Sequence, residues 1–299
     1  MKIESLDGPV LQSEISAFKA YMKSLKDPVP DNIGNNFVYG KCGTNTESLG
    51  IMYEISHDQE ILDQMIRYAD LMLNARNNPV SGRIIWTGKR EPCWPNKKAV
   101  AADSVYSATE NGDIIAHIAY CAKLIIQDKN LWNQKVVTGD PFQFGKTYIE
   151  RARTYLKECN KTIDEFILPN FVKEGSLQFI FPVSEKFGFD ARSKMSLGKP
   201  VPWNQQTMLA GGFQRLAECF ELLGEEPQRV KLYDYIVKTS VTSFLKSLVR
   251  YQVNGHDCYK WSYSADDPAL KYGEDAGHGG YDILGVFRAY QRNNYHLSK

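Results

Sequence analysis

Apolar residues recur at helical spacing along most of this 299-residue chain, and this restricts the fold more than any other sequence feature. Residues three and four positions apart share one face of a helix, so each apolar stripe predicts an amphipathic helix. Such stripes run through residues 11–25, 47–56, 61–73, 148–159, 209–223 and 230–248. Residues 114–126 are apolar on nearly every face, which predicts a helix inside the protein. The expected fold class is therefore all-α.

The order of these segments favours an α/α toroid. Short turns join residues 47–56 to 58–76 and 204–223 to 227–248, and long loops rich in glycine, proline and tryptophan separate the pairs. Residues 66–73 also resemble residues 149–156, a weak internal repeat. We expect one catalytic domain over residues 1–299, a compact or incomplete six-hairpin toroid with loops and short β segments at one rim. Residues 1–43 would form an N-terminal helix and an extended arm packed on it. A non-toroidal helical bundle or solenoid is the alternative.

Composition excludes several classes of partner. The formal net charge of +1 argues against nucleic acid or a membrane surface as a partner. No apolar run approaches the roughly 20 residues that span a bilayer. The first residues lack the apolar core of a signal peptide, so we expect a cytoplasmic protein, or a secreted one whose signal has been removed. The six cysteines form no metal-ligand pairs, and neither a metal nor a cofactor is expected. The sequence leaves the oligomeric state open.

The segment from Tyr272 to Asp282 carries the densest polar chemistry. It interleaves carboxylates, a histidine and two tyrosines with four glycines, just before an apolar helical pattern at residues 283–290. A glycine-rich loop lets the backbone approach a ligand closely. Asp275 or Asp282 could cap the helix that follows. The residues expected to contribute to a site are Glu274, Asp275, His278 and Tyr281, and the structural alternative is a solvated polar loop.

Four tryptophans lie in loops outside the helical stripes. Trp86 and Trp94 belong to a loop rich in glycine and proline, Trp203 precedes a helical stripe, and Trp261 alternates with tyrosines at 259 and 263. Indole faces stack on the apolar faces of sugar rings, so we expect these side chains to bind saccharide in one cleft. The alternative for the first two is that they close the end of the core.

Two further polar clusters open predicted helices. Glu110 and Asn111 precede the apolar segment at 114–126, and Asn204 and Gln205 open the stripe at 209–223. Carboxamides can hold sugar hydroxyls or a carboxylate without titrating. A cap role is the alternative for each asparagine. Because all the polar clusters join predicted inner helices, a toroid would bring them to one rim, which predicts an oligo- or polysaccharide site.

These motifs resemble those of the α/α-toroid proteins that act on polysaccharides, most closely the glucuronan- and alginate-type lyases. The similarity rests on residues 110–112, 202–205, 261–263 and 274–279, and it covers roughly residues 62–292. The resemblance implies a tyrosine acid/base, with an asparagine, histidine or arginine facing the uronate carboxylate. The chain is shorter than many members of this group.

The leading hypothesis is β-elimination on a uronic-acid glycan without a metal. Asn204, His278 and Asn111 are the expected donors to the carboxylate, and Tyr263 and Tyr281 the expected acid/base residues, with Tyr263 preferred. Lys260 or Arg288 would lower the tyrosine pKa. The alternatives are an inverting glycoside hydrolase that pairs Glu110 with Glu274 or Asp275, a uronate epimerase, and a carbohydrate-binding protein without catalysis.

Overall fold

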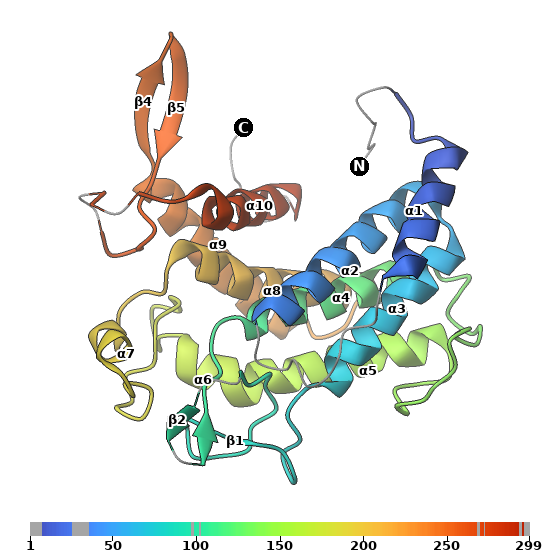
Figure 1. Cartoon of the computed structure of the whole chain (residues 1–299), viewed down its shortest axis with the longest axis horizontal. Helices are drawn as coiled ribbons and strands as arrows, with labels where there is room; N and C mark the ends of the chain where they lie inside the picture. Colours follow the sequence, from blue (N-terminus) through green and yellow to red (C-terminus); the bar gives the residue numbers. More distant parts are fainter. Residues whose placement is uncertain are drawn as a thin grey trace.

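The computed structural model describes residues 8–25, 36–96, 99–101, 103–267, 270–271, 273–292 and 295, with only the backbone described at 36–42, 99 and 192 (Figure 1). These residues are mostly helical, which confirms the all-α class. The helices are α1 (Gln12–Ser24), α2 (Asn36–Ser56), α3 (Gln59–Asn74), α4 (Asn111–Gln127), α5 (Tyr148–Thr162), the π-helical turn η2 (Ile163–Ile167), α6 (Leu168–Phe171), α7 (Ala191–Ser196), α8 (Trp203–Leu223), α9 (Pro227–Ser247) and α10 (Ala276–Arg292). None of these described helices is long and apolar enough to cross a membrane.

The strands are short and lie in the connections. Strands β1 (Ile84–Ile85), β3 (Ser104–Val105) and β2 (Ala99–Ala101) form a small sheet in that order. Strands β4 (Val249–Val253) and β5 (His256–Lys260) form an antiparallel hairpin that projects from the helical body (Figure 1). The expectation of little sheet beyond loop strands is confirmed for the described residues.

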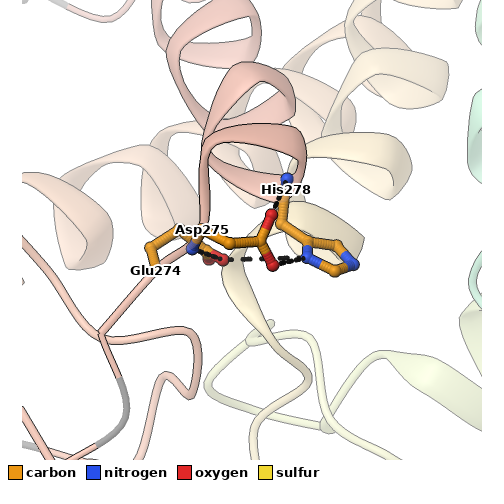
Figure 2. A group of neighbouring side chains, drawn as sticks. All are labelled: Glu274, Asp275 and His278. Carbon is orange, nitrogen blue, oxygen red and sulfur yellow. Dashed lines mark hydrogen bonds and ion pairs between the residues drawn. The ribbon is translucent and has the colours of Figure 1, made fainter.

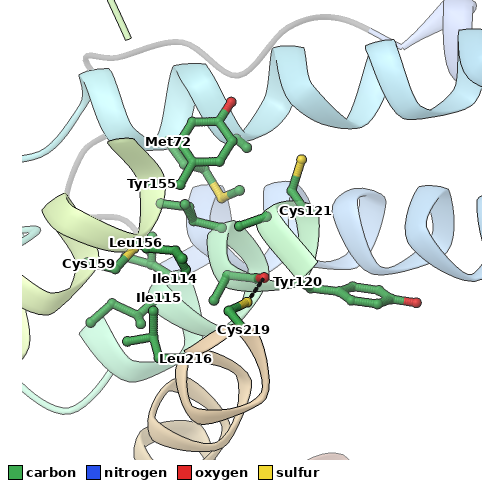
Figure 3. Close-up of a cluster of buried hydrophobic side chains, with 14 of the residues drawn as sticks. Met72, Ile114, Ile115, Tyr120, Cys121, Tyr155, Leu156, Cys159, Leu216 and Cys219 are labelled. Carbon is green, nitrogen blue, oxygen red and sulfur yellow. Dashed lines mark hydrogen bonds between the residues drawn. The ribbon is translucent and has the colours of Figure 1, made fainter. Parts of the chain in front are cut away.

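Helix α4 lies at the centre of the core, as its apolar sequence predicts. It packs against α8 and α5, and also contacts α2 and α3. All its residues are buried except Lys123 and Gln127. Figure 3 shows side chains of α4 meeting those of α3, α5 and α8. Cys121, Cys159 and Cys219 are buried free thiols in this core.

Glycines allow α4 and α8 to approach closely. A Cβ atom on Gly112 would lie 2.5 Å from the Cα of Leu209, and one on Gly212 would lie 2.8 Å from the carbonyl oxygen of Gly112. Real side chains do not tolerate such contacts with backbone atoms. The two glycines therefore set the distance between the two most intimately packed helices, and with it the spacing of their N-terminal ends.

A buried charged cluster joins four helices. Glu47 of α2 accepts hydrogen bonds from Arg215 of α8 at 2.9 and 2.6 Å, and its carboxylate lies 2.8 Å from Arg288 of α10. His117 of α4 lies 3.2 Å from Glu47 and 3.3 Å from Asp113. Buried charges are costly unless paired, so this cluster holds the helices in one relative position.

Two expectations about local structure are wrong. The glycine-rich segment is not a loop, because α10 begins at Ala276 and includes Gly277 to Asp282. The arm expected up to residue 43 is not extended over its last part, since α2 begins at Asn36. The rest of that arm, at residues 26–35, and Tyr272 lie outside the described residues.

Candidate functional site

A cavity of about 360 Å³ lies at the N-terminal ends of α4, α8 and α10. Six of the residues expected in a site line it: Glu110, Asn204, Gln205, Tyr263, His278 and Tyr281. The other lining residues are Asn96, Tyr106, Thr109, Asp113 and Met208. The predicted convergence of separate polar clusters therefore holds for these six side chains.

Three helix N-termini meet at this cavity. Glu110 and Asp113 belong to the first turn of α4 or its cap, Asn204 and Gln205 to the first turn of α8, and His278 to that of α10. The N-terminal end of a helix carries a partial positive charge from its aligned peptide dipoles. Three such ends favour an anionic ligand, such as a carboxylate.

His278 is held in place by Asp275, as Figure 2 shows. Asp275 caps α10: its Oδ1 accepts hydrogen bonds from the backbone N–H groups of Gly277 at 2.8 Å and His278 at 3.0 Å. Its Oδ2 forms an ion pair with Nδ1 of His278. These backbone and side-chain bonds from His278 lower the pKa of Asp275. The carboxylate thus fixes the imidazole, while Nε2 lies on the opposite edge of the ring from Asp275 (Figure 2).

Tyr263 is in direct contact with this histidine. The two ring centroids are 5.2 Å apart, with an interplanar angle of 68°. The carbonyl oxygen of Tyr263 accepts a hydrogen bond of 3.4 Å from the backbone N–H of Trp203, at the start of α8. The tyrosine is therefore tied to α8 through its backbone and to α10 through its ring.

Glu110 and Asn204 bring buried polar atoms without hydrogen-bond partners among the described residues. These atoms are Oε1 of Glu110 and Oδ1 of Asn204. Burial raises the pKa of Glu110 to about 7, although hydrogen bonds from its own backbone and from Asn96 favour its charged form. Buried oxygens of this kind normally bind a partner, so these two mark where a ligand would make hydrogen bonds.

Asp113 forms the floor of the cavity and joins it to the buried charged cluster. Burial alone would raise its pKa, but the charge of His117 and the hydrogen bond from it hold the pKa below its usual value. The pKa of His117 is raised in turn, because Asp113 and Glu47 outweigh the effect of its own burial. The floor is therefore an ion pair of a carboxylate with a protonated imidazole.

Of the two cations expected to lower a tyrosine pKa, Arg288 acts on Tyr281 in the expected direction but is outweighed. Burial raises the pKa of Tyr281, and the charge of Asp113 raises it further against the opposing charge of Arg288. Arg288 pairs with Glu47, and Nζ of Lys260 lies over the ring of Tyr251 at 5.9 Å. His278 lies beside the other acid/base candidate, Tyr263.

Asn111 is a structural residue and not a ligand donor. It is fully buried, and its Oδ1 accepts a hydrogen bond of 2.7 Å from the backbone N–H of Trp94. Its amide donates to Oγ of Ser107 at 3.0 Å and to the carbonyl of Ala108 at 2.7 Å. Both amide hydrogens are used, so none remains for a substrate.

Three of the four tryptophans belong to the core. Trp86 and Trp94 are 3% and 0% exposed, and their indole N–H groups donate to the carbonyls of Ser107 and Met72. Trp203 is 4% exposed and packs edge-on against Phe244. A stacking role in a shared cleft is therefore wrong for these three: their rings have no free face, and for the first two the alternative of closing the core holds.

Glu274 and Trp261 lie on a different groove from Tyr263. This groove runs between α10 and the β4–β5 hairpin, with a volume of about 750 Å³. The Glu274 side chain is 4% exposed and accepts a hydrogen bond of 3.0 Å from the backbone N–H of Asp275. Trp261 Nε1 donates to Asp282 at 2.9 Å. Burial and the adjacent Glu274 carboxylate raise the pKa of Asp282 to about 7. Pairing Glu110 with Glu274 or Asp275 across one sugar is thus wrong, because neither acid lines the cavity.

Glu274, Asp275 and His278 also form a possible cation site. One ligand atom from each lies within 4.8 Å of the others (Figure 2). Both carboxylate oxygens of Asp275 are already engaged, one by the helix cap and the other by the imidazole. A cation would have to displace the imidazole from Asp275, at a helix end whose partial charge repels it. The arrangement is explained without a metal.

The sequence reasoning missed five lining residues. The hydroxyl of Thr109 donates to Oε1 of Gln205 at 2.7 Å and so links two cavity walls. Asp113 follows Glu110 by three residues, a spacing that places both on one helix face. Asn96, Tyr106 and Met208 carry no local pattern that separates them from ordinary loop and helix residues.

No family model matches this chain, and no curated protein or solved structure matches it.

Proposed function

We propose that this chain is a compact α/α toroid that cleaves a uronic-acid-containing glycan by β-elimination. Support for the toroid comes from the alternation of helices along the chain. Helices α2, α4, α8 and α10 share the buried cluster around Glu47, whereas α3, α5 and α9 pack mainly against the helix before or after them in sequence. The inner helices would form the ring and the outer helices would cover it.

The contact of Tyr263 with His278, where three helix N-termini converge, carries the proposal. Elimination begins with removal of the weakly acidic proton beside the uronate carboxylate. It requires a base, and positive charge near the carboxylate as the enolate-like state forms. Asp275 holds the His278 imidazole in place beside Tyr263, and a ring N–H of His278 donates to the substrate carboxylate in the proposed step.

The proposed step balances without a cofactor. Ionised Tyr263 takes the proton from C5, the C5–H electron pair forms a double bond between C4 and C5, and the C4–O bond breaks. The departing oxygen receives a proton from Tyr263 or Tyr281. Asn204 and Gln205 of α8 hold the uronate, and Glu110 in its neutral form donates a hydrogen bond to it.

The test is product analysis on a panel of uronic-acid polymers. We expect an unsaturated product that absorbs in the near ultraviolet. Tyr263→Phe should lower turnover by about 10²- to 10⁴-fold, as for loss of a proton-transfer group, and His278→Ala by about a hundredfold. The matched controls are Tyr235→Phe, which is 57% exposed on α9, and His256→Ala, which is exposed in β5. Full activity of Tyr263→Phe would overturn the proposal, as would new reducing ends without ultraviolet absorbance.

One observation favours glycoside hydrolysis as the second candidate. Glu110 and Asp113 line the same cavity, and their surroundings move their pKa values in opposite directions. Such a pair can supply a neutral acid and an ionised base. In that case Glu110→Gln would abolish cleavage and Tyr263→Phe would retain it.

A further inference from the structure

A larger cleft adjoins the cavity on the side of α7. This cleft has a volume of about 720 Å³, twice the 360 Å³ of the cavity. Asn96, Tyr106, Gln205 and Tyr263 line both, so the two spaces are adjacent and share a wall. A ligand that fills the cavity with one ring would have room to continue into the cleft.

Aromatic side chains form one wall of the cleft. Tyr106 lies 5.5 Å from Phe187 and 5.7 Å from Phe189 between ring centroids, and Phe181 stacks on Phe187 at 5.8 Å. Phe187 is buried, whereas Tyr106, Phe181 and Phe189 are partly exposed in the cleft. Rigid aromatic faces of this kind suit the apolar faces of sugar rings.

The two carboxylates of the cleft accept hydrogen bonds from nearby residues, whereas its lysine forms no ion pair with a described residue. Asp190 caps α7 by accepting the backbone N–H of Ser193 at 2.8 Å, and Asp266 accepts a hydrogen bond from the Ser264 hydroxyl. Lys199 is exposed on the same cleft and forms no ion pair with a described residue. Its ammonium group is therefore available to an anionic ligand, with three hydrogen-bond donors.

We infer that this cleft binds the sugar residues that continue the glycan chain from the cavity, with Lys199 contacting a carboxylate and Phe189 stacking on a ring. The inference rests on the proposed function and deepens it. The protein acts on uronate chains that extend from the cavity into the cleft. Short fragments bind weakly because they leave the cleft empty.

The experiment uses uronate oligosaccharides of two to six residues with the full chain. We expect kcat/KM to rise with length and then level off. Phe189→Ala and Lys199→Gln should raise KM for the long substrates by about threefold to tenfold, consistent with one stacking or charged contact. They should leave kcat, and the KM of the shortest cleaved substrate, unchanged. Lys186→Gln, an exposed lysine outside the cleft, is the matched control.

If Phe189→Ala and Lys199→Gln lower kcat/KM equally at every substrate length, or do not lower it at all, the cleft assignment is overturned. Either result leaves the elimination chemistry intact. If the wild type cleaves no substrate, the proposed function fails, and calorimetric titration with the six-residue oligosaccharide then tests the cleft separately. Weaker binding by Phe189→Ala and Lys199→Gln than by Lys186→Gln would support it. Binding that these two variants do not change, or no binding by the wild type, would contradict it.

Discussion

The raised pKa of the Glu110 carboxyl predicts how the unfolding free energy depends on pH, and this prediction needs no substrate. Its pKa of about 7 in the folded protein exceeds its ordinary value of 4.5 by about 2.5. Each pKa unit corresponds to about 1.4 kcal/mol, so ionising Glu110 in place costs the folded state about 3 kcal/mol. Because the folded pKa is the higher one, this contribution is fully present below pH 4.5 and is lost as the pH rises through 7.

Glu110→Gln removes this titration and keeps the shape of the neutral acid. Between pH 5 and pH 9 the wild type should lose about 2–3 kcal/mol of unfolding free energy that the variant keeps. At about 2 °C per kcal/mol for a chain of this size, the melting temperatures should diverge by ~5 °C over that range. Denaturant titrations and thermal melts at several pH values measure both quantities.

Asp282 also has a raised pKa, so the stability of both proteins falls with pH, and only the difference between them reports on Glu110. Glu174→Gln, which changes an exposed glutamate, should follow the wild type. Parallel pH curves for Glu110→Gln and the wild type would mean that the carboxyl is solvated and titrates normally. Its proposed donation to a uronate would then fail at neutral pH.

Three further outcomes are expected. Asp275→Asn keeps an acceptor for the helix cap but loses the charge beside His278. Turnover should therefore fall about ten- to a hundredfold, while the unfolding free energy changes by less than about 1 kcal/mol. A variant as active as the wild type would show that Asp275 is not part of the site. Glu47→Gln leaves buried cations without a counter-charge and should lower the unfolding free energy by about 3–5 kcal/mol in urea titrations. Gly112→Ala forces α4 away from Leu209 and should cost about 1–3 kcal/mol, whereas an alanine that melts like the wild type would show that the helix contact is loose.

Sequence periodicity could predict the helices and the cavity because both follow from local rules. An apolar stripe needs a buried face, and the segment at 114–126 has no polar face, so it becomes the central helix α4. Polar residues collect at helix starts, where free backbone N–H groups need partners. When N-terminal ends of inner helices meet, their polar residues meet too, which is why Glu110, Asn204 and His278 share one cavity.

The errors have physical causes that a local pattern does not contain. Glycines at 277, 279 and 280 interrupt the apolar pattern that would predict the first turns of α10. Gly279 and Gly285 allow close packing and do not make a flexible loop. A Cβ on Gly285 would lie 2.7 Å from Thr207 of α8, and one on Gly279 would lie 3.3 Å from Trp261. The loop holding Trp94 is bonded to α3 through Met72 and to α4 through Asn111, so an indole outside any helical stripe is still fully buried. Only tertiary contacts decide such positions.

The buried charged cluster and the cavity are electrostatically one unit. Asp113 belongs to both, and an unpaired carboxylate at the cavity floor would repel a uronate. His117 compensates that charge, and below it Glu47 faces Arg215 and Arg288, so the cations outnumber the carboxylates while the imidazole is protonated. The floor then adds to the positive field of the three helix ends instead of opposing it. The raised pKa of His117 thus supports the proposed binding of a uronate as well as helix cohesion, since the same proton serves both.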